Sequence, residues 1–387
     1  MGDIAERDNS CSSNNNSNKR IVLKIGTSTL TDDNGKVDEA YITRLASQVA
    51  EIRRQAAQVL IVSSGAISAG LEALGLPAER PDSIPTLQAA AAVGQLALAK
   101  VYSSAFAAED LTIGQVLLTR FDTTNRNSYL HVRDTLERLL ELGSVPLINE
   151  NDTVAVEEIR FGDNDTLAAL VAILVKADLV ILLSDIDGLY TADPRLEQDA
   201  RLLESIGALT EELEAGAGAA GSVRGSGGMV TKLEAARICM AANIPMVICQ
   251  GRDEGAIAQA IAGKPVGTLF SREGQHRQAS AKKLWLALSD SVKGYVTVDD
   301  GAARALQERG SSLLPVGVSG VHGDFSAGQA IDIRNSHGFL IARGISGYSA
   351  AELHLAAGLK SGEVASNDQL AHLADTEVVH RDQLLVF

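Results

Sequence analysis

Short runs of β-branched and aliphatic residues alternate with longer segments of helical periodicity from residue 20 onward. This alternation is typical of a parallel sheet whose strands are joined by crossover helices. Strands are predicted over 21–25, 59–62, 113–118, 145–148, 179–183 and 246–249. Helices are predicted between them, over 38–55, 86–108, 127–142, 164–176 and 231–242. The pattern therefore predicts an α/β fold, a three-layer αβα sandwich with a mostly parallel sheet.

The pattern changes near residue 269, where a polar stretch without periodicity begins. Short alternating runs with Gly-containing turns follow at 284–288, 295–298 and 330–334, with one helix near 301–308. The N-terminal stretch is rich in Asn and Ser and has no apolar segment, which excludes a signal peptide or membrane span there. We predict a disordered tail over 1–18, an α/β domain over 19–271 and a small β-rich domain over 280–387.

Composition agrees with two folded units and narrows the classes of partner. The chain has 387 residues, 45% hydrophobic and only 4% aromatic, which allows a sizeable aliphatic core and a second compact unit. A formal net charge of -15 disfavours general attraction to nucleic acid or anionic lipid. The 3 cysteines have no metal-ligand spacing and imply no disulfide framework, so we expect a cytoplasmic protein without membrane contact.

Two segments at the ends of predicted strands are candidates for phosphate chemistry. Lys24 leaves the first strand beside Gly26, where its ammonium could meet transferring phosphoryl oxygens. An ordinary strand-end lysine is the alternative, and this segment alone does not exclude it. Small residues over 63–70 follow the second strand, at the sheet edge where helix N-termini attract anions. Tight helix packing explains these small residues equally well.

Asn and Asp residues cluster at two further positions, over 149–152 and 162–165. Such groups can bind an amino group or a carboxylate, orient lysines, or hold Mg²⁺ through water. Helix N-capping is the alternative for the second cluster. Because so many polar groups gather on one edge of the predicted sheet, we favour a binding site.

A glycine-rich segment over 225–232 leads into the helix predicted at 231–242 and includes its first two residues. Its lysine does not directly follow a glycine, so the loop is not a Walker P-loop. Glycines, a hydroxyl and a lysine at a helix start nevertheless suit a polyphosphate.

Together and in this order, these segments resemble the amino acid kinase family, and within it the members that phosphorylate glutamate. The resemblance covers nearly the whole chain from Arg20, and residues 308–315 resemble part of a PUA domain, a module associated with RNA modification. It implies transfer of the γ-phosphoryl group of ATP to the side-chain carboxylate of L-glutamate with Mg²⁺, toward proline. It also implies a homo-oligomer, dimer or tetramer, and proline as feedback inhibitor, with a variable loop over 121–129 helping to recognise glutamate and proline.

The resemblance also assigns site residues. The catalytic residues it implies are Lys24, Lys232 and Asp165, the aspartate orienting the two lysines. Glutamate would be bound by Ser64, Asp152 and Asn164, with Asn149 and Asp163 nearby. The nucleotide would be held by Lys24, Ser184, Asp185, Ser226, Gly227, Gly228, Met229, Val230, Thr231 and Lys232. Ser63, Ser184 and Ser226 stand where threonine is frequent in the family, and each keeps a hydroxyl.

Elementary electrostatics agrees with these roles. A carboxylate attacking a polyphosphate brings two anions together, so fixed positive charge is needed where charge spreads over the transferred group. A substrate carboxylate is already ionised at neutral pH, so no general base and no catalytic histidine are expected.

Two other functions are alternatives. A related kinase acting on acetylglutamate, aspartate or carbamate would keep the sheet and lysines and change the acceptor pocket; the two Asn/Asp clusters favour glutamate. An RNA-binding PUA protein is the alternative of a different class. Residues 280–387 carry nine Lys and Arg against twelve Asp and Glu, which lacks the basic footprint of RNA contact. We therefore expect no RNA binding by the PUA domain.

Overall fold

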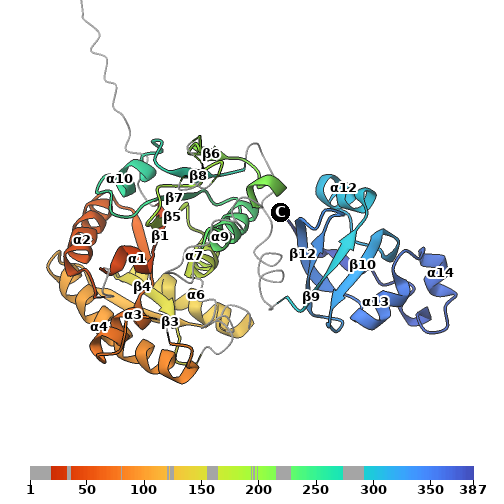
Figure 1. Cartoon of the computed structure of the whole chain (residues 1–387), viewed down its shortest axis with the longest axis horizontal. Coiled ribbons are helices and arrows are strands. Elements are labelled where there is room, and N and C mark those ends of the chain that lie inside the picture. Colours follow the sequence, from red (N-terminus) through yellow and green to blue (C-terminus); the bar gives the residue numbers. More distant parts are fainter. Residues whose placement is uncertain are drawn as a thin grey trace, which may run out of the picture.

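The computed structural model describes residues 19–32, 36–79, 81–119, 122, 126–154, 164–192, 194, 197, 199–214, 228–272 and 292–387. Within these ranges the chain forms an eight-stranded sheet and a five-stranded sheet (Figure 1). The predicted tail over 1–18 and the predicted strand at 284–288 lie outside the described residues. The α/β fold class is confirmed.

The first sheet has the strand order β3-β4-β2-β1-β5-β7-β8-β6, and its central pairs are parallel. β8 runs antiparallel to β7. The strands are β1 Arg20–Ile25, β2 Gln58–Ser63, β3 Ile113–Leu118, β4 Val145–Glu150, β5 Leu179–Ser184, β6 Ser205–Ile206, β7 Met246–Gln250 and β8 Thr268–Phe270. All six predicted strands are present, whereas β6 and β8 were not predicted.

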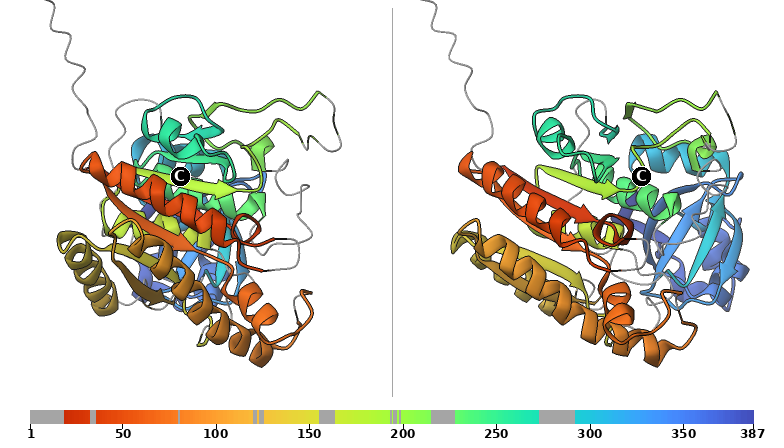
Figure 2. Two further views of the ribbon diagram at one scale, coloured as in Figure 1. Left: turned by 90° about the vertical axis from the view of Figure 1, so that its left-hand side faces the viewer. Right: turned by 60° about the vertical axis from the view of Figure 1, so that its left-hand side comes forward.

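Helices cover both faces of this sheet, which gives the three layers (Figures 1 and 2). They are α1 Thr27–Leu30, α2 Glu39–Arg54, α3 Ala66–Ala73, α4 Ile84–Ala107, α6 Arg126–Glu141, α7 Asn164–Leu174, α9 Met229–Ala241 and α10 Ala256–Ile261. Side chains of α2, α4 and α10 share one buried cluster with Ile21 and Leu23 of β1. Those of α6, α7 and α9 share another with Val22. Because strand side chains alternate, β1 feeds both cores.

The second sheet has the order β10-β9-β11-β12-β13 and is antiparallel except for the β9–β11 pair. Its strands are β9 Gly294–Val298, β10 Val318–Gly323, β11 Ala330–Arg334, β12 Leu340–Ser346 and β13 Val379–Val386. Helices α12 Asp300–Arg309, α13 Ala350–Ala356 and α14 Ser361–Ala365 accompany it, with 3₁₀ turns η2 Pro315–Gly317 and η3 Ala371–Leu373. The prediction of one helix in this part was therefore incomplete.

No helix among the residues described is both long and apolar enough to cross a membrane.

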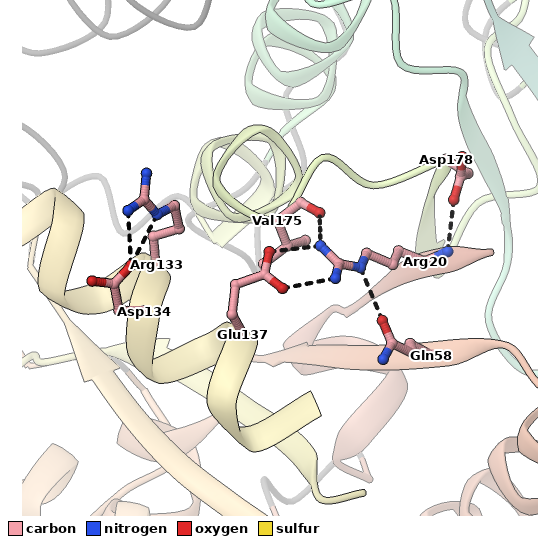
Figure 3. Close-up of polar contacts among 7 residues, drawn as sticks. All are labelled: Arg20, Gln58, Arg133, Asp134, Glu137, Val175 and Asp178. Atoms are coloured by element: carbon pink, nitrogen blue, oxygen red, sulfur yellow. Dashed lines mark hydrogen bonds and ion pairs between the residues drawn. The ribbon is translucent and has the colours of Figure 1, made fainter. Parts of the chain in front are cut away.

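Arg20, at the start of β1, ties several elements together (Figure 3). Its guanidinium donates to both carboxylate oxygens of Glu137 on α6, at 2.6 and 2.7 Å. It also donates to Gln58 at 2.9 Å and to the carbonyl of Val175 at 2.7 Å. A two-pronged pair of this kind is both strong and directional. Arg20 therefore fixes α6 and the end of α7 against the sheet, at the opposite end of β1 from Lys24.

Replacing Arg20 by alanine is expected to lower the free energy of unfolding by about 2 kcal/mol, because a charge-assisted network is lost while Glu137 stays half-buried. Chemical denaturation measures this. Arg54→Ala is the matched control: its ion pair with Glu51 is exposed, so its loss should cost little. Equal effects of the two substitutions would contradict the role of Arg20.

Candidate active site

Two buried lysines meet at one buried carboxylate. The ammonium of Lys24 lies 2.6 Å from Oδ1 of Asp165, and that of Lys232 lies 3.4 Å from Oδ2. Asp165 is fully buried and both lysine side chains are 8% exposed. The hydroxyl of Thr231 donates to the same carboxylate at 3.0 Å. Residues from β1, α7 and α9 thus converge on one point.

The fold explains this convergence. Alternation along β1 puts Lys24 on the same face as Val22, against which α7 and α9 pack. Asp165 lies in the first turn of α7 and Lys232 in the first turns of α9. Both helices therefore begin at the sheet edge where β1 ends, the usual ligand edge of an open α/β sheet.

Among the residues that the structure describes, the ion pairs at this point join two positive charges to one negative charge. Burial alone would raise the pKa of Asp165, but Lys24 and Lys232 hold it below its ordinary value, so the carboxylate is ionised at neutral pH. Two ammonium groups then surround one carboxylate in a buried setting. Such an arrangement attracts a further anion and suits the terminal phosphates of a nucleotide.

A cluster of amides lies beside the lysines. The Nδ2 group of Asn164 donates to the hydroxyl of Ser64 at 2.8 Å, to Oδ1 of Asn149 at 3.0 Å and to the carbonyl of Ser63 at 3.1 Å. The buried Oδ1 of Asn164 has no hydrogen-bond partner among the described residues. A buried acceptor of this kind is costly unless a ligand supplies a donor. The cluster therefore presents an acceptor that suits an ammonium group.

Gln95 of α4 is a residue of this cluster that sequence reasoning missed. Its Oε1 accepts a hydrogen bond from Nδ2 of Asn149 at 2.7 Å, which fixes the orientation of the Asn149 amide. The Oδ1 atom of Asn149 therefore faces Asn164 and accepts a hydrogen bond from it. The only signal in the sequence is a polar residue within a helix of mostly small and apolar side chains. Gln95 is therefore a positioning residue for the cluster.

Some of the residues predicted to bind the nucleotide lie around the same edge. Ser184 ends β5, which pairs with β1 in a register that sets Lys24 beside Leu182. Its hydroxyl donates to Asp185 at 3.1 Å. Gly228 is the N-cap of α9 and makes no side-chain hydrogen bond to the first N–H groups of that helix. Met229 and Val230 continue from Gly228 into the first turn, before Thr231.

Four predicted residues remain. Asp152 lies half-buried in the turn after β4. Asp163, Ser226 and Gly227 lie outside the described residues. Their assignments stay predictions.

Comparisons with known proteins agree with this geometry. The model of the amino acid kinase family matches residues 19–250, and the model of the PUA domain matches residues 294–366. The chain belongs to the amino acid kinase family. It is 45% identical to a glutamate 5-kinase of Citrifermentans bemidjiense over 95% of this chain and 97% of that protein. It is 47% identical to a glutamate 5-kinase of Moorella thermoacetica over 95% of this chain and 96% of that protein.

The small residues after β2 allow a tight turn and close helix packing in this amino acid kinase. Anion binding by this segment stays a prediction. Gly65 has φ 87°, a left-handed conformation that favours glycine, and it caps α3 directly after Ser64. Gly70 packs against α4: a Cβ there would lie 1.7 Å from the carbonyl oxygen of Ala90. A Cβ on Gly94 of α4 would likewise lie 1.8 Å from the carbonyl oxygen of Ala66. The beginning of the segment therefore shapes the site, and the rest allows two helices to touch.

Gln95→Leu is expected to raise the KM for the acceptor about tenfold in this amino acid kinase, with a smaller change in kcat. The reason is that the Asn149 amide loses its orienting acceptor. Steady-state kinetics measures the effect, with thermal unfolding as the check on folding. Lys100→Ala, at an exposed position of the same helix, is the control. An unchanged KM would exclude the positioning role.

Proposed function

We propose that this protein transfers the γ-phosphoryl group of ATP to the side-chain carboxylate of L-glutamate, giving L-glutamyl 5-phosphate for proline synthesis. The observation that carries the proposal is the pair of buried lysines on Asp165, beside the amide cluster of Ser64, Asn149 and Asn164. Relatives named glutamate 5-kinase that align over almost their whole length support the same acceptor.

The residues act mainly through charge and position. Lys24 and Lys232 stabilise the negative charge that spreads over the transferred phosphoryl oxygens. Asp165 attracts both ammonium groups, offsets their mutual repulsion and so holds them close to one point. It is not a base, because its pKa is lowered. The N–H groups at the start of α9 and the residues Ser184 and Asp185 hold the nucleotide. The acceptor carboxylate is already ionised at neutral pH, so it attacks the γ-phosphoryl group without the help of a base.

The amide cluster favours an acceptor with a free amino group. The Oδ1 of Asn164, which has no hydrogen-bond partner among the described residues, can accept a hydrogen bond from an α-ammonium group, which carries three N–H donors. An acetylated nitrogen, as in acetylglutamate, offers one N–H and no charge. Glutamate is therefore a better fit than acetylglutamate. Asp152 follows Asn149 closely in the sequence, and Asp163 directly precedes Asn164. These two carboxylates are proposed to complete the glutamate site.

Mg²⁺ is proposed to enter with the nucleotide. Within the described ranges, no group of three or more His, Cys, Asp or Glu side chains could hold a metal ion. Both oxygens of Asp165 face lysines. This donor set fits Mg²⁺ held mostly by phosphates and water, its common mode in nucleotide sites. Bound there, Mg²⁺ would neutralise phosphate charge.

The test is a panel of acceptors assayed with ATP and Mg²⁺: glutamate, acetylglutamate, aspartate and carbamate. Formation of an acyl phosphate is detected with hydroxylamine, and kcat/KM is compared across the panel. Glutamate should exceed every other acceptor by at least about a hundredfold, since a buried polar site discriminates strongly against ligands that leave its groups unpaired. A higher value for another acceptor would overturn the substrate assignment.

Proline inhibition and a homo-oligomer are proposed as well. The exposed apolar side chains Val93 and Leu96 of α4, with Leu117 on the edge strand β3, suit a subunit interface. Light scattering gives the subunit number and a proline titration gives the inhibition. RNA binding by the PUA domain is not proposed, and a gel shift at physiological salt tests that choice.

A further inference from the structure

Helix α9 has a second buried cation that the proposed mechanism does not use. Arg237 lies five residues after Lys232, and its side chain is 6% exposed. Five residues along a helix correspond to about 7.5 Å, so the two cations sit on one short rigid element. Whatever holds Arg237 in place therefore also restricts Lys232.

The partners of Arg237 come from both the N-terminal and the C-terminal part of the chain. From the first part of the chain, Glu214 forms an ion pair with it and Glu234 lies 3.3 Å from its Nε. From the second sheet, the carbonyl of Leu340 accepts from Nη1 at 3.2 Å. The rings of Phe339 and Phe387 lie 5.9 and 5.3 Å from its guanidinium, within cation–π range.

The ion pairs continue into the second sheet. Glu234 also pairs with Arg343 of β12 at 3.5 Å, and Arg343 pairs with Asp332 of β11 at 2.7 Å. The side chains of Arg343 and Asp332 are 9% and 11% exposed. Buried charges are tolerated only when each has its partner, so this chain of contacts specifies one position of α9 against β12.

Apolar packing reinforces the same contact. Leu385 of β13 belongs to the buried cluster of the first sheet, together with Leu182 of β5 and Leu233, the residue after Lys232. Figure 1 shows the C-terminus between α9 and β12. The second sheet is therefore continuous with the core around the catalytic helix.

We propose that Arg237 is a positioning residue through which the C-terminal domain holds α9, and with it Lys232, in place for phosphoryl transfer. This gives the C-terminal domain a task in catalysis that needs no bound RNA. The proposal rests on the proposed phosphoryl transfer but not on the identity of the acceptor.

A double-mutant cycle in the full-length chain tests this. Arg237→Met is expected to lower kcat about tenfold in the wild-type background, and by less than about twofold when Lys232 is already alanine. A residue that only stabilises the fold would reduce both rates by the same factor. Equal factors in the two backgrounds, or an unchanged kcat in Arg237→Met, would overturn the proposal.

The control is His337→Ala, which removes the exposed 3.2 Å contact between Nδ1 of His337, in the turn after β11, and Glu211 and removes no side-chain partner of Arg237. Its kcat should equal that of the wild type. If Arg237→Met does not fold, the same cycle is run with Arg237→Lys, which keeps the charge and loses the planar fork. All rates are measured with the acceptor that the wild type uses best. A wrong acceptor assignment would therefore be detected by the panel of acceptors described above and would not change the outcome of the double-mutant cycle.

Discussion

Lys232→Ala is expected to lower kcat by a factor of about 10² to 10³ and to leave the protein folded. In the proposed mechanism, the ammonium of Lys232 supplies charge where the transferred phosphoryl group becomes most negative, and losing one preorganised donor at such a point has this size of effect. Folding should survive because Lys24 stays 2.6 Å from Asp165 and still neutralises it. Steady-state kinetics and thermal unfolding, measured on the same preparation, check both parts.

Lys264→Ala is the control for Lys232, since Lys264 is exposed and follows α10 on another part of the sheet. It should keep the wild-type kcat. If Lys232→Ala retained kcat within about twofold, Lys232 would not contact the reacting group. If it unfolded, its main contribution would be to stability and not to charge placement.

Asp165→Asn is expected to damage both activity and stability. The substitution leaves two buried ammonium groups without their shared carboxylate, and breaking a buried ion pair from one side costs about 3–5 kcal/mol. Lys24 and Lys232 would also move apart through mutual repulsion, so kcat should fall about a hundredfold. Denaturant titration gives the free energy of unfolding, and kinetics gives the rate.

The pH dependence separates this charge effect from a packing defect. The pKa of Asp165 is lower in the folded protein than in the unfolded chain, so its contribution is fully present at neutral pH. That contribution should be lost as the pH falls below about 4. The stability gap between wild type and Asp165→Asn should therefore narrow in acid. A gap that stayed constant down to pH 3 would contradict the charge explanation.

The first sheet could be predicted because its central strands carry continuous aliphatic runs, as in β1 and β2. β6 and β8 are too short for any periodicity to register. β10 reads Val-Ser-Gly-Val-His-Gly, where two glycines hide the alternation. Helix α13 did have a sequence signal that was not used: Ser349 and Glu352 form a capping box.

The site could be predicted only in part, for a physical reason. Family resemblance assigned roles to Lys24, Asp165 and Lys232, whose side chains the fold brings together. Gln95 and Arg237 have no local pattern that marks them. Their decisive partners lie 54 and 103 positions away along the chain, and contacts at such separations follow from topology alone.

The burial of Leu385 in the first core bears on how the protein is made. During synthesis, the α/β half emerges first and can begin to fold, but the hydrophobic surface that Leu385 covers stays open until β13 has followed. The nascent chain should therefore pass through a stage in which apolar side chains beside α9 are still exposed to water. At that stage chaperone contact is most useful, and ribosome stalling between β8 and β13 would be most harmful.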